Sequence, residues 1–179
     1  MKFCSNCGAK VSIQVPAGDD RNRHVCIECE TIHYQNPKVI TGCLPVFEDK
    51  ILLCKRAIEP RANLWTLPAG FMENGESIEE GALRESWEEA RVKISNPSLY
   101  QVFSVPYINQ VYVFYKGEVA NQDFGPGPES LEVELFDFDQ IPWDKLAFPV
   151  VRITLENYLT DYSNNVFPVH NDIVTSNNG

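Results

Sequence analysis

The chain has 179 residues, 44% hydrophobic and 22% charged, which suits one main globular domain with a small attachment. Its formal net charge of −10 argues against broad binding to duplex DNA, which requires a basic surface. No apolar run reaches transmembrane length, and the first residues contain no signal-peptide core. We therefore expect a cytoplasmic protein with no membrane partner.

Four cysteines near the start of the chain form two C-x2-C pairs. Cys4 and Cys7 are followed, after eighteen residues, by Cys26 and Cys29. This spacing is typical of a zinc site, and four thiolates complete a tetrahedral shell, which indicates structural Zn²⁺. Disulfides or redox pairs are the alternatives, but the sequence shows neither an oxidising compartment nor a thioredoxin-like context. The shell is complete without two nearby histidines, His24 and His33.

The next predicted elements are β-strands. Residues 39–47 and 50–55 are β-rich runs that predict a hairpin, and residues 64–67 predict another short strand. Cys43 and Cys54 fall within the hairpin strands. We expect both to be buried, because a free cysteine behaves as a small hydrophobic side chain.

A helix beginning after Ser77 carries a cluster of carboxylates. Ser77 and Glu80 match a capping box, with Ser77 as the N-cap. Glu85, Glu88 and Glu89 are spaced i, i+3, i+4, so they share one face, where like charges repel unless a cation lies between them. Mg²⁺ suits such oxygens, although a solvated acidic helix is the alternative. The glutamates are expected to point outward, opposite a core-facing side made of Leu83, Ser86, Trp87 and Ala90.

The rest of the chain predicts strands, a loop and a second helix. Glycines and prolines at 125–128 mark the loop, and residues 148–162 predict a helix with Pro149 near its first turn. The asparagine-rich segment 163–179 is expected to be mobile or to dock across a dimer partner. Further strands are expected at residues 99–105, 110–119 and 131–137. Strands around two helices indicate an α/β fold.

Residues 70–92 resemble the Nudix box, G-x5-E-x7-R-E-U-x-E-E-x-G-U, in which U is aliphatic. Ser86 replaces an aliphatic residue, and Arg91 replaces the second glycine, which in the family ends the helix. In left-handed geometry the Cβ of Arg91 would cost about 1 kcal/mol, unless the helix ends differently. We expect weakened stability rather than lost activity. The fixed positions that match are Gly70, Glu76, Arg84, Glu85, Glu88, Glu89 and Val92.

The resemblance implies a Nudix α/β/α sandwich with a mixed sheet, preceded by the small four-cysteine zinc ribbon. It also implies hydrolysis of a nucleoside diphosphate linked to another group, a reaction in which metal ions neutralise charge and assist attack by water. Glu85 and Glu89 would be the principal ligands of Mg²⁺ or Mn²⁺, with Glu88 sharing a metal or orienting water. The Ala69 carbonyl would be a backbone ligand.

Two further roles follow from the resemblance. Arg84 is expected to hold Glu76 and to stiffen the loop before the helix. In relatives that cleave ADP-ribose, a glutamate outside the box often serves as the general base. Glu129 and Glu132, beside the loop 125–128, are the candidates here, and a solvated loop position is the alternative for both.

The substrate is indicated by segments outside the box. A zinc ribbon before a Nudix domain is similar to NADH pyrophosphatases, but their motif Ser-Gln-Pro-Trp-Pro-Phe-Pro does not occur in this sequence. Residues 34–38, 64–71, 105–112 and 125–132 look instead like the zinc-ribbon FAD/ADP-ribose pyrophosphatase subgroup. That implies conversion of ADP-ribose to AMP and ribose 5-phosphate, or of FAD to AMP and FMN. Aromatic side chains that could stack on a flat ring, unless they belong to the core, are Tyr107, Tyr112 and Phe114.

The expected organisation is a zinc ribbon at 1–34, a Nudix hydrolase domain at 35–162 and a tail at 163–179. The expected partner is a small nucleotide, and a homodimer stays open. An NADH pyrophosphatase and a non-catalytic nucleotide-sensing module are the alternative functions, although a sensor would normally have lost box glutamates. A role in RNA binding through the ribbon conflicts with the acidic balance of the chain.

Overall fold

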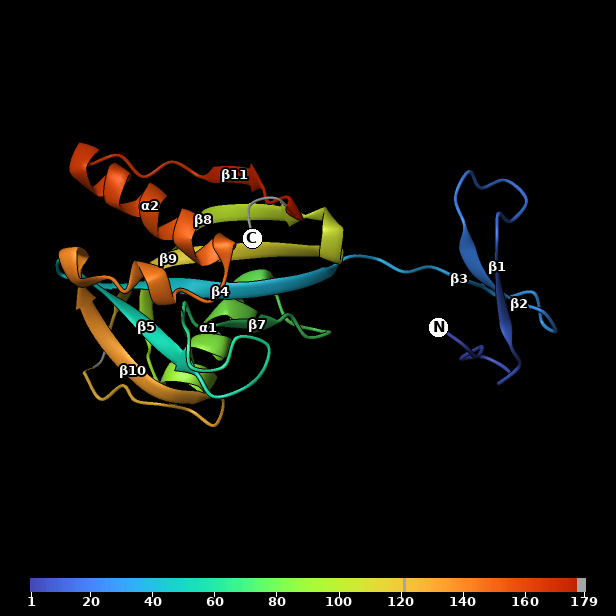
Figure 1. Cartoon of the computed structure of the whole chain (residues 1–179), viewed down its shortest axis with the longest axis horizontal. Coiled ribbons are helices and arrows are strands. Elements are labelled where there is room, and N and C mark those ends of the chain that lie inside the picture. Colours follow the sequence, from blue (N-terminus) through green and yellow to red (C-terminus); the bar gives the residue numbers. More distant parts are fainter. Residues whose placement is uncertain (121, 177–179) are drawn as a thin grey trace. The chain divides into compact units, whose positions relative to one another are not determined.

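The computed structural model describes residues 1–120 and 122–176, and it divides into two compact units, Met1–Pro37 and Lys38–Gly179 (Figure 1). The first unit contains β1 (Val11–Gln14), β2 (Arg23–Cys26) and β3 (Ile32–His33), which form an antiparallel sheet in the order β1-β2-β3. Its buried hydrophobic residues are few, namely Cys4, Val25 and Cys26.

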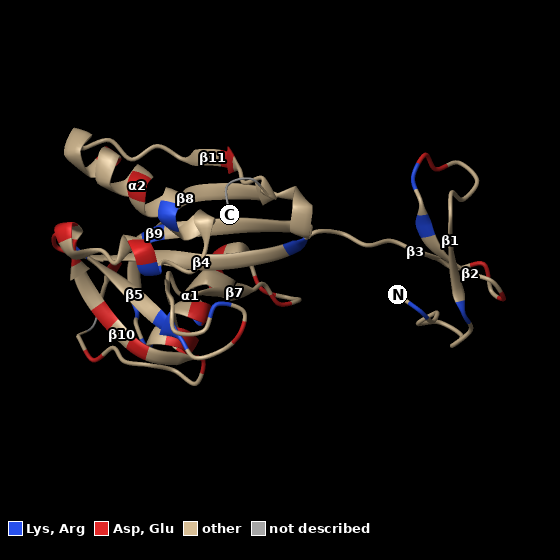
Figure 2. Ribbon diagram, in the orientation of Figure 1, with Lys and Arg blue, Asp and Glu red and all other residues tan. Residues whose placement is uncertain are grey.

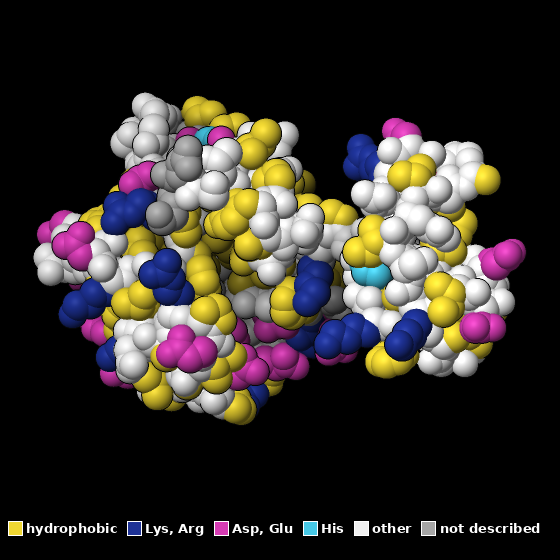
Figure 3. All heavy atoms as spheres, turned by 45° about the vertical axis from the view of Figure 1, so that its right-hand side comes forward, with side chains coloured by type: hydrophobic (Ala, Val, Ile, Leu, Met, Phe, Trp, Pro, Cys, Tyr) yellow, Lys and Arg dark blue, Asp and Glu magenta, His cyan; other side chains and the backbone are white. Residues whose placement is uncertain are grey.

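Hydrophobic side chains on the first unit are largely exposed, and several are visible in Figure 3. Short strands with so little buried apolar surface cannot supply the stability of a folded domain, so this unit needs another source of free energy. The exposed set includes Phe3, Ile13, Val15, Ile27 and Tyr34.

The second unit is built on a mixed sheet with the strand order β10-β5-β4-β9-β8-β11. β4 runs parallel to β9 and antiparallel to β5, and the short β6 and β7 pair with β5 and β4. The expected hairpin, the short strand after it and the later strands are confirmed. Their bounds are β4 (Lys38–Phe47), β5 (Lys50–Arg56), β6 (Trp65–Thr66), β7 (Ala69–Phe71), β8 (Ile94–Val105), β9 (Gln110–Val119) and β10 (Ser130–Asp137).

Two hydrophobic clusters cover the two faces of this sheet, and β5 shows how they are divided. Ile51 and Leu53 pack with Val151 and Leu155 of α2 (Pro149–Asn164), whereas Leu52 and Cys54 belong to a second cluster. That second cluster includes Ala90, at the end of α1 (Ile78–Ala90), together with Val92 and Val119. Because successive strand residues point to opposite faces, this alternation gives the α/β/α sandwich that the sequence indicated. Cys43 and Cys54 are both buried, as expected.

The end of the chain differs from the expected tail. α2 continues to Asn164, and residues His170–Ile173 form β11, which pairs in parallel with β8 at the edge of the sheet (Figure 1). His170 Nε2 lies 2.7 Å from Asp161 Oδ2 on α2. The Asp161 carboxylate also accepts a 2.6 Å hydrogen bond from the Tyr100 hydroxyl. The second unit thus includes β11 from the expected tail at 163–179, and residues 177–179 of that tail lie outside the described residues.

Helix α1 starts where the sequence indicated. The Ser77 hydroxyl accepts from the Glu80 amide at 3.1 Å, and the Glu80 carboxylate accepts from the Ser77 amide at 2.7 Å. This confirms the capping box. Within the described part of the chain, no helix has both the length and the apolar character needed to cross a membrane.

Candidate functional site

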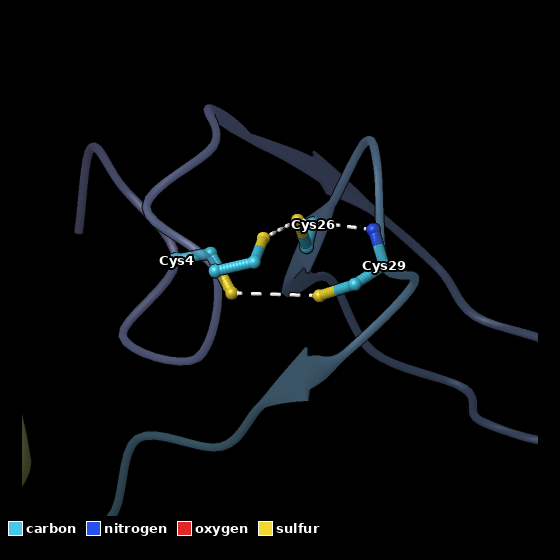
Figure 4. Close-up of side chains that lie close together, drawn as sticks. Cys4, Cys26 and Cys29 are labelled. Carbon is cyan, nitrogen blue, oxygen red and sulfur yellow. Dashed lines mark hydrogen bonds between the residues drawn. The ribbon is translucent and has the colours of Figure 1, made fainter.

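The four cysteines of the first unit lie together at one end of its sheet. The Sγ atoms of Cys4 and Cys29 are 3.7 Å apart, and those of Cys7 and Cys26 are 3.4 Å apart, so neither pair is a disulfide (Figure 4). All four ligand atoms lie within 4.8 Å of one another. Tetrahedral Zn²⁺ with Zn–S bonds of about 2.3 Å would separate its sulfurs by roughly 3.8 Å. The quartet therefore fits a structural zinc ion.

The sulfurs of the quartet accept hydrogen bonds from nearby groups, and the thiol pKa values of two of them shift in opposite directions. The pKa of Cys7 is raised to about 12, because the lowering effect of the Ala9 backbone is outweighed by hydrogen bonds with Cys29 and Cys26. The Asn6 amide donates to Cys4 Sγ at 3.3 Å, and the Cys29 amide donates to Cys26 Sγ at 3.4 Å. Hydrogen bonds from Thr31, followed by those from neighbouring cysteines, lower the pKa of the Cys29 thiol. His33 Nε2 lies 3.2 Å from Cys4 Sγ, so this histidine contacts a sulfur instead of replacing it. Such outer contacts orient and stabilise metal-binding sulfurs.

The glutamates of α1 do not all point outward, and that expectation was wrong. Glu85 and Glu89 are only 9% and 7% exposed, whereas Trp87, expected in the core, is 43% exposed. The helix is rotated so that both carboxylates turn toward β7, which runs beside it. Glu88 remains on the exposed side. Ser86 is buried as expected, and its hydroxyl donates to the Ala82 carbonyl at 2.8 Å.

Glu85 and Glu89 converge on the backbone of β7. Glu89 Oε2 accepts a hydrogen bond from the Ala69 amide at 3.1 Å. A Cβ at Gly70 would lie 2.4 Å from the Glu85 carboxylate, so a side chain at this position would require the carboxylate to move. The Nudix-box glycine and two box glutamates thus form one compact group with Ala69, whose carbonyl is the expected backbone ligand.

Burial of these carboxylates favours the binding of a cation. Desolvation raises the pKa of Glu89 to about 8, and it also raises the pKa of Glu85. The charge of Glu85 raises the pKa of Glu89 further. Two buried carboxylates at such a site are stabilised by a divalent cation, and hard oxygen donors of this kind suit Mg²⁺ or Mn²⁺. The donor set therefore fits the metal that the sequence indicated.

Arg84 connects the box residues, as expected. Its guanidinium donates to both oxygens of Glu76, through Nε at 3.0 Å and Nη2 at 2.8 Å. Nη1 donates to Glu85 at 2.7 Å and to Glu88 at 3.0 Å. The hydrogen bonds from Arg84 lower the pKa of Glu76 to about 2. Arg84 thus holds Glu76 and also orients two of the expected ligands.

The metal ligands are assembled to different degrees in the two units. Among the described residues, the four cysteines form a group of potential metal ligands whose ligand atoms all lie within 4.8 Å of one another. Glu85, Glu88 and Glu89 are less tightly gathered, because Arg84 and the Ala69 amide engage their oxygens. Figure 2 marks the acidic positions on α1 and along β10.

The two candidates for the general base lie in different surroundings. Glu132 forms a 2.8 Å ion pair with Lys55 across the β5–β10 pair. Glu129 lies just before β10, and its charge raises the pKa values of both Glu85 and Glu89. Glu129 thus lies within electrostatic reach of the box glutamates, whereas Glu132 is held by a lysine.

The three aromatic candidates are also separated by their surroundings. Tyr107 is half exposed, on a short 3-10 turn (Pro106–Ile108) before β9. Tyr112 is partly buried, and its hydroxyl donates to Gln110 at 3.1 Å. Phe114 is 1% exposed and belongs to the core, so ring stacking by Phe114 is excluded in this structure. Because strand residues alternate between faces, Phe114 shares its face of β9 with Tyr112, and both pack against the same hydrophobic cluster.

Arg56 is a site residue that the sequence reasoning missed. Its charge lowers the pKa of Glu89 and also that of Tyr112, so it lies within electrostatic reach of both the carboxylates and an aromatic candidate. Its Nε donates to the Pro60 carbonyl at 3.0 Å, and its guanidinium lies over Phe148 at 5.2 Å. A basic residue at the end of the buried strand β5 was the available signal.

Arg91 adopts the backbone conformation of the family glycine. Its φ of 53° and ψ of 24° are left-handed, and its amide donates to the Trp87 carbonyl at 2.9 Å. The alternative, in which the helix ends differently, is therefore wrong. The guanidinium lies 5.6 Å from the centre of the Trp87 ring, and this cation–π contact offsets part of the backbone strain.

Comparison with known protein families identifies the family to which the chain belongs. A profile described as "NUDIX domain" matches residues 36–156, and one described as "Nudix N-terminal", a zinc ribbon, matches residues 2–35. The chain belongs to the Nudix family. It is a Nudix hydrolase with the N-terminal zinc-ribbon module, and enzymes of this family use divalent metals.

Two similar proteins of the Nudix family are named for different activities. An ADP-ribose pyrophosphatase of Methanocaldococcus jannaschii is 32% identical over 133 residues, which cover 70% of this chain and 75% of that protein. The NAD-capped RNA hydrolase NudC of Edwardsiella ictaluri is 28% identical over 160 residues. That match covers 87% of this chain but 59% of NudC, so the chain spans less than two thirds of this relative.

A solved Nudix structure is similar over almost the full length. The crystal structure of a NUDIX hydrolase from Nitrosomonas europaea is 48% identical, with a TM-score of 0.95. The match covers 98% of this chain and 100% of that one. A solved member of the family is therefore similar to this chain over nearly all of its residues.

Proposed function

We propose that the protein hydrolyses the pyrophosphate bond of a nucleoside diphosphate derivative, most directly ADP-ribose or FAD, and releases AMP. Water adds to one phosphorus and the phosphoanhydride bond breaks, which gives AMP with ribose 5-phosphate, or AMP with FMN. The observation that carries this proposal is the convergence of the buried Glu85 and Glu89 carboxylates on the Ala69–Gly70 backbone.

Each of these residues has a defined task in the proposed reaction. Glu85, Glu89 and the Ala69 carbonyl would hold Mg²⁺ or Mn²⁺, with Glu88 completing the set. The bound cations supply charge neutralisation at the pyrophosphate and activation of water. Arg84 fixes the direction of Glu85 through their 2.7 Å hydrogen bond.

Three residues outside the box complete the proposed site. Glu129 is favoured over Glu132 as the general base, because Glu132 is paired with Lys55 while Glu129 affects both buried box glutamates. Arg56 is placed to attract the anionic substrate beside Glu89. The half-exposed Tyr107 is the candidate for stacking on a flat ring.

The zinc ribbon has a separate role in this proposal. Cys4, Cys7, Cys26 and Cys29 would hold one structural Zn²⁺, in agreement with the sulfur distances. Its closed four-sulfur shell leaves no position for substrate, so the ribbon takes no part in the chemical step.

NADH is a second candidate substrate. A zinc ribbon before a Nudix domain is similar to NADH pyrophosphatases, and one relative named NudC matches 87% of the chain. The missing Ser-Gln-Pro-Trp-Pro-Phe-Pro segment and the ADP-ribose pyrophosphatase relative favour the first proposal. Both substrates contain the same bond. They differ in the group beyond the second phosphate, which the box does not contact by itself.

A substrate panel tests the proposal. Purified protein with Mg²⁺ or Mn²⁺ is offered ADP-ribose, FAD, NADH, diadenosine polyphosphates and oxidised deoxynucleotides, and AMP release is followed by chromatography. We expect the highest kcat/KM with ADP-ribose or FAD, and loss of activity in the control Glu85→Gln. A clear preference for NADH would refute the substrate assignment, and unchanged activity of Glu85→Gln would refute the metal assignment.

A further inference from the structure

The loop that carries Glu129 is docked on the last turn of α1. The final carbonyls of a helix have no partners within the helix and must be satisfied from outside. Here the Gly127 amide donates to the Glu89 carbonyl at 2.9 Å, and the Gly125 amide donates to the Ala90 carbonyl at 2.9 Å. The loop therefore binds the backbone of Glu89 itself, one of the expected metal ligands.

Gly127 packs against this turn more closely than any side chain would allow. A Cβ at position 127 would lie 1.7 Å from the Glu88 carbonyl oxygen and 2.8 Å from the Glu88 carbonyl carbon. These atoms belong to helix backbone, which cannot move aside as a flexible side chain can. At Gly125, in contrast, an added Cβ would meet nothing within 4 Å. An added methyl group would therefore clash at position 127 but not at position 125.

A second anchor holds the loop on the other side of Glu129. The Glu129 carbonyl accepts from the Ala57 amide at 2.8 Å, just beyond β5. Ser130 is paired with Arg56, and its amide donates to the Gly127 carbonyl at 3.1 Å. The register of β10 against β5 shifts between Ser130 and Glu132, and such irregularities re-aim side chains beside active sites.

We propose that Gly127 is the positioning residue for Glu129: its close packing on the last turn of α1 holds the loop that carries Glu129 beside the backbone of Glu89. The inference rests on the proposed pyrophosphatase activity and adds to it the element that orients the base. Glu129 is exposed, so its own side-chain burial does not fix its direction. The position of its backbone is instead fixed two residues earlier, at Gly127, and at its own carbonyl.

The experiment compares Gly127→Ala with the matched control Gly125→Ala, each alone and combined with Glu129→Gln. Kinetics on the best substrate of the panel give kcat and KM separately. We expect Gly127→Ala to lower kcat by about 10- to 100-fold, a partial loss of the roughly 100- to 10,000-fold that a positioned general base contributes, with little change in KM. Gly125→Ala should stay within about twofold of the wild type, because its added methyl group meets open space.

The combined variants separate positioning from general damage to the fold. If Gly127 acts through Glu129, Gly127→Ala should lower kcat by less than about threefold when Glu129 is already glutamine. An undiminished loss in the Glu129→Gln background would overturn the proposal, because Gly127 would then act through α1 and the metal ligands. Wild-type activity of Gly127→Ala would overturn it as well.

Hydrogen exchange tests the inference without relying on enzyme activity, and a second variant tests it if Gly127→Ala does not fold. Hydrogen exchange of residues 124–130 should become faster in Gly127→Ala but not in Gly125→Ala; unchanged exchange would overturn the docking, even if no substrate of the panel is cleaved. If Gly127→Ala does not fold, Ala57→Pro removes the donor to the Glu129 carbonyl instead. It should lower kcat only while Glu129 is present, and an equal loss without Glu129 would contradict the proposal.

Discussion

The two metal-binding regions differ in what brings their ligands together. In the ribbon, four sulfurs lie within 4.8 Å of one another on a unit whose buried hydrophobic residues are few. In the Nudix unit, Glu85 and Glu89 are buried against a sheet that has hydrophobic clusters on both faces. We therefore expect the ribbon to depend on a metal for its fold, and we propose that the Nudix unit uses its fold to build a metal site.

This comparison makes the strongest prediction for the ribbon. Cys26→Ala removes one of four zinc ligands, and zinc binding of this kind is worth about 10–16 kcal/mol at neutral pH. We expect the variant to lose zinc and the first unit to unfold, while the second unit stays folded. Native mass spectrometry gives the zinc content, and limited proteolysis shows which unit becomes sensitive.

The matched control is Cys43→Ala, which changes an equally buried cysteine in the Nudix unit. It should keep its zinc and a protease-resistant ribbon. If Cys26→Ala binds zinc as the wild type does, the ribbon does not depend on its metal in the way described, and the contrast between the two units fails.

A smaller effect is expected from Arg84→Lys, which tests how the Nudix site is held. Lysine cannot reproduce the two hydrogen bonds from one planar group to Glu76. Loss of such charge-assisted bonds in a partly buried site should lower the free energy of unfolding by about 1–3 kcal/mol. Urea unfolding measures it. Lys50→Ala is the control, because its exposed ion pair with Asp137 should contribute at most about 1 kcal/mol; equal losses would contradict the role of Arg84.

The smallest effect concerns the end of α1. Arg91→Gly relieves left-handed strain of about 1 kcal/mol but removes the cation–π contact with Trp87, worth roughly 0.5–1 kcal/mol. We expect a slight gain in stability, or none, with unchanged activity. Arg91→Ala loses the contact without relieving the strain, so it should be less stable than Arg91→Gly. Thermal unfolding of the pair decides, and the reverse order would show that the strain is unimportant.

Ligand identity could be predicted from sequence spacing, but burial could not. The intervals between the cysteines are fixed locally, so the zinc quartet followed from them, whereas the Arg84–Glu76 contact followed from the resemblance to the Nudix box. The direction of Glu85 and Glu89 depends on how α1 lies against β7, which is tertiary information. Helical periodicity alone assigned Trp87 to the core and the glutamates to solvent, because it assumes that carboxylates avoid burial.

Long-range pairings account for the other differences. β11 has little hydrophobic signal of its own, and it is recruited to the sheet by β8 and by the contacts of Asp161 with Tyr100 and His170. Arg56 and Gly127 act on Glu89 from segments more than thirty residues away in the sequence. Local patterns mark only a basic residue at a strand end and a glycine in a loop, since the roles of both residues arise only when the strands and α1 come together.

The central claim is that Glu85 and Glu89, gathered on the Ala69–Gly70 backbone, form a divalent-metal centre for pyrophosphate hydrolysis. Glu89→Gln tests it most directly, because glutamine keeps the shape and can still accept the Ala69 hydrogen bond. Calorimetric titration with Mn²⁺ and AMP release are measured on the same samples. We predict metal binding at least about 10-fold weaker and AMP release at least about 100-fold slower, with the fold and zinc content intact. Unchanged metal binding and unchanged AMP release would contradict the claim.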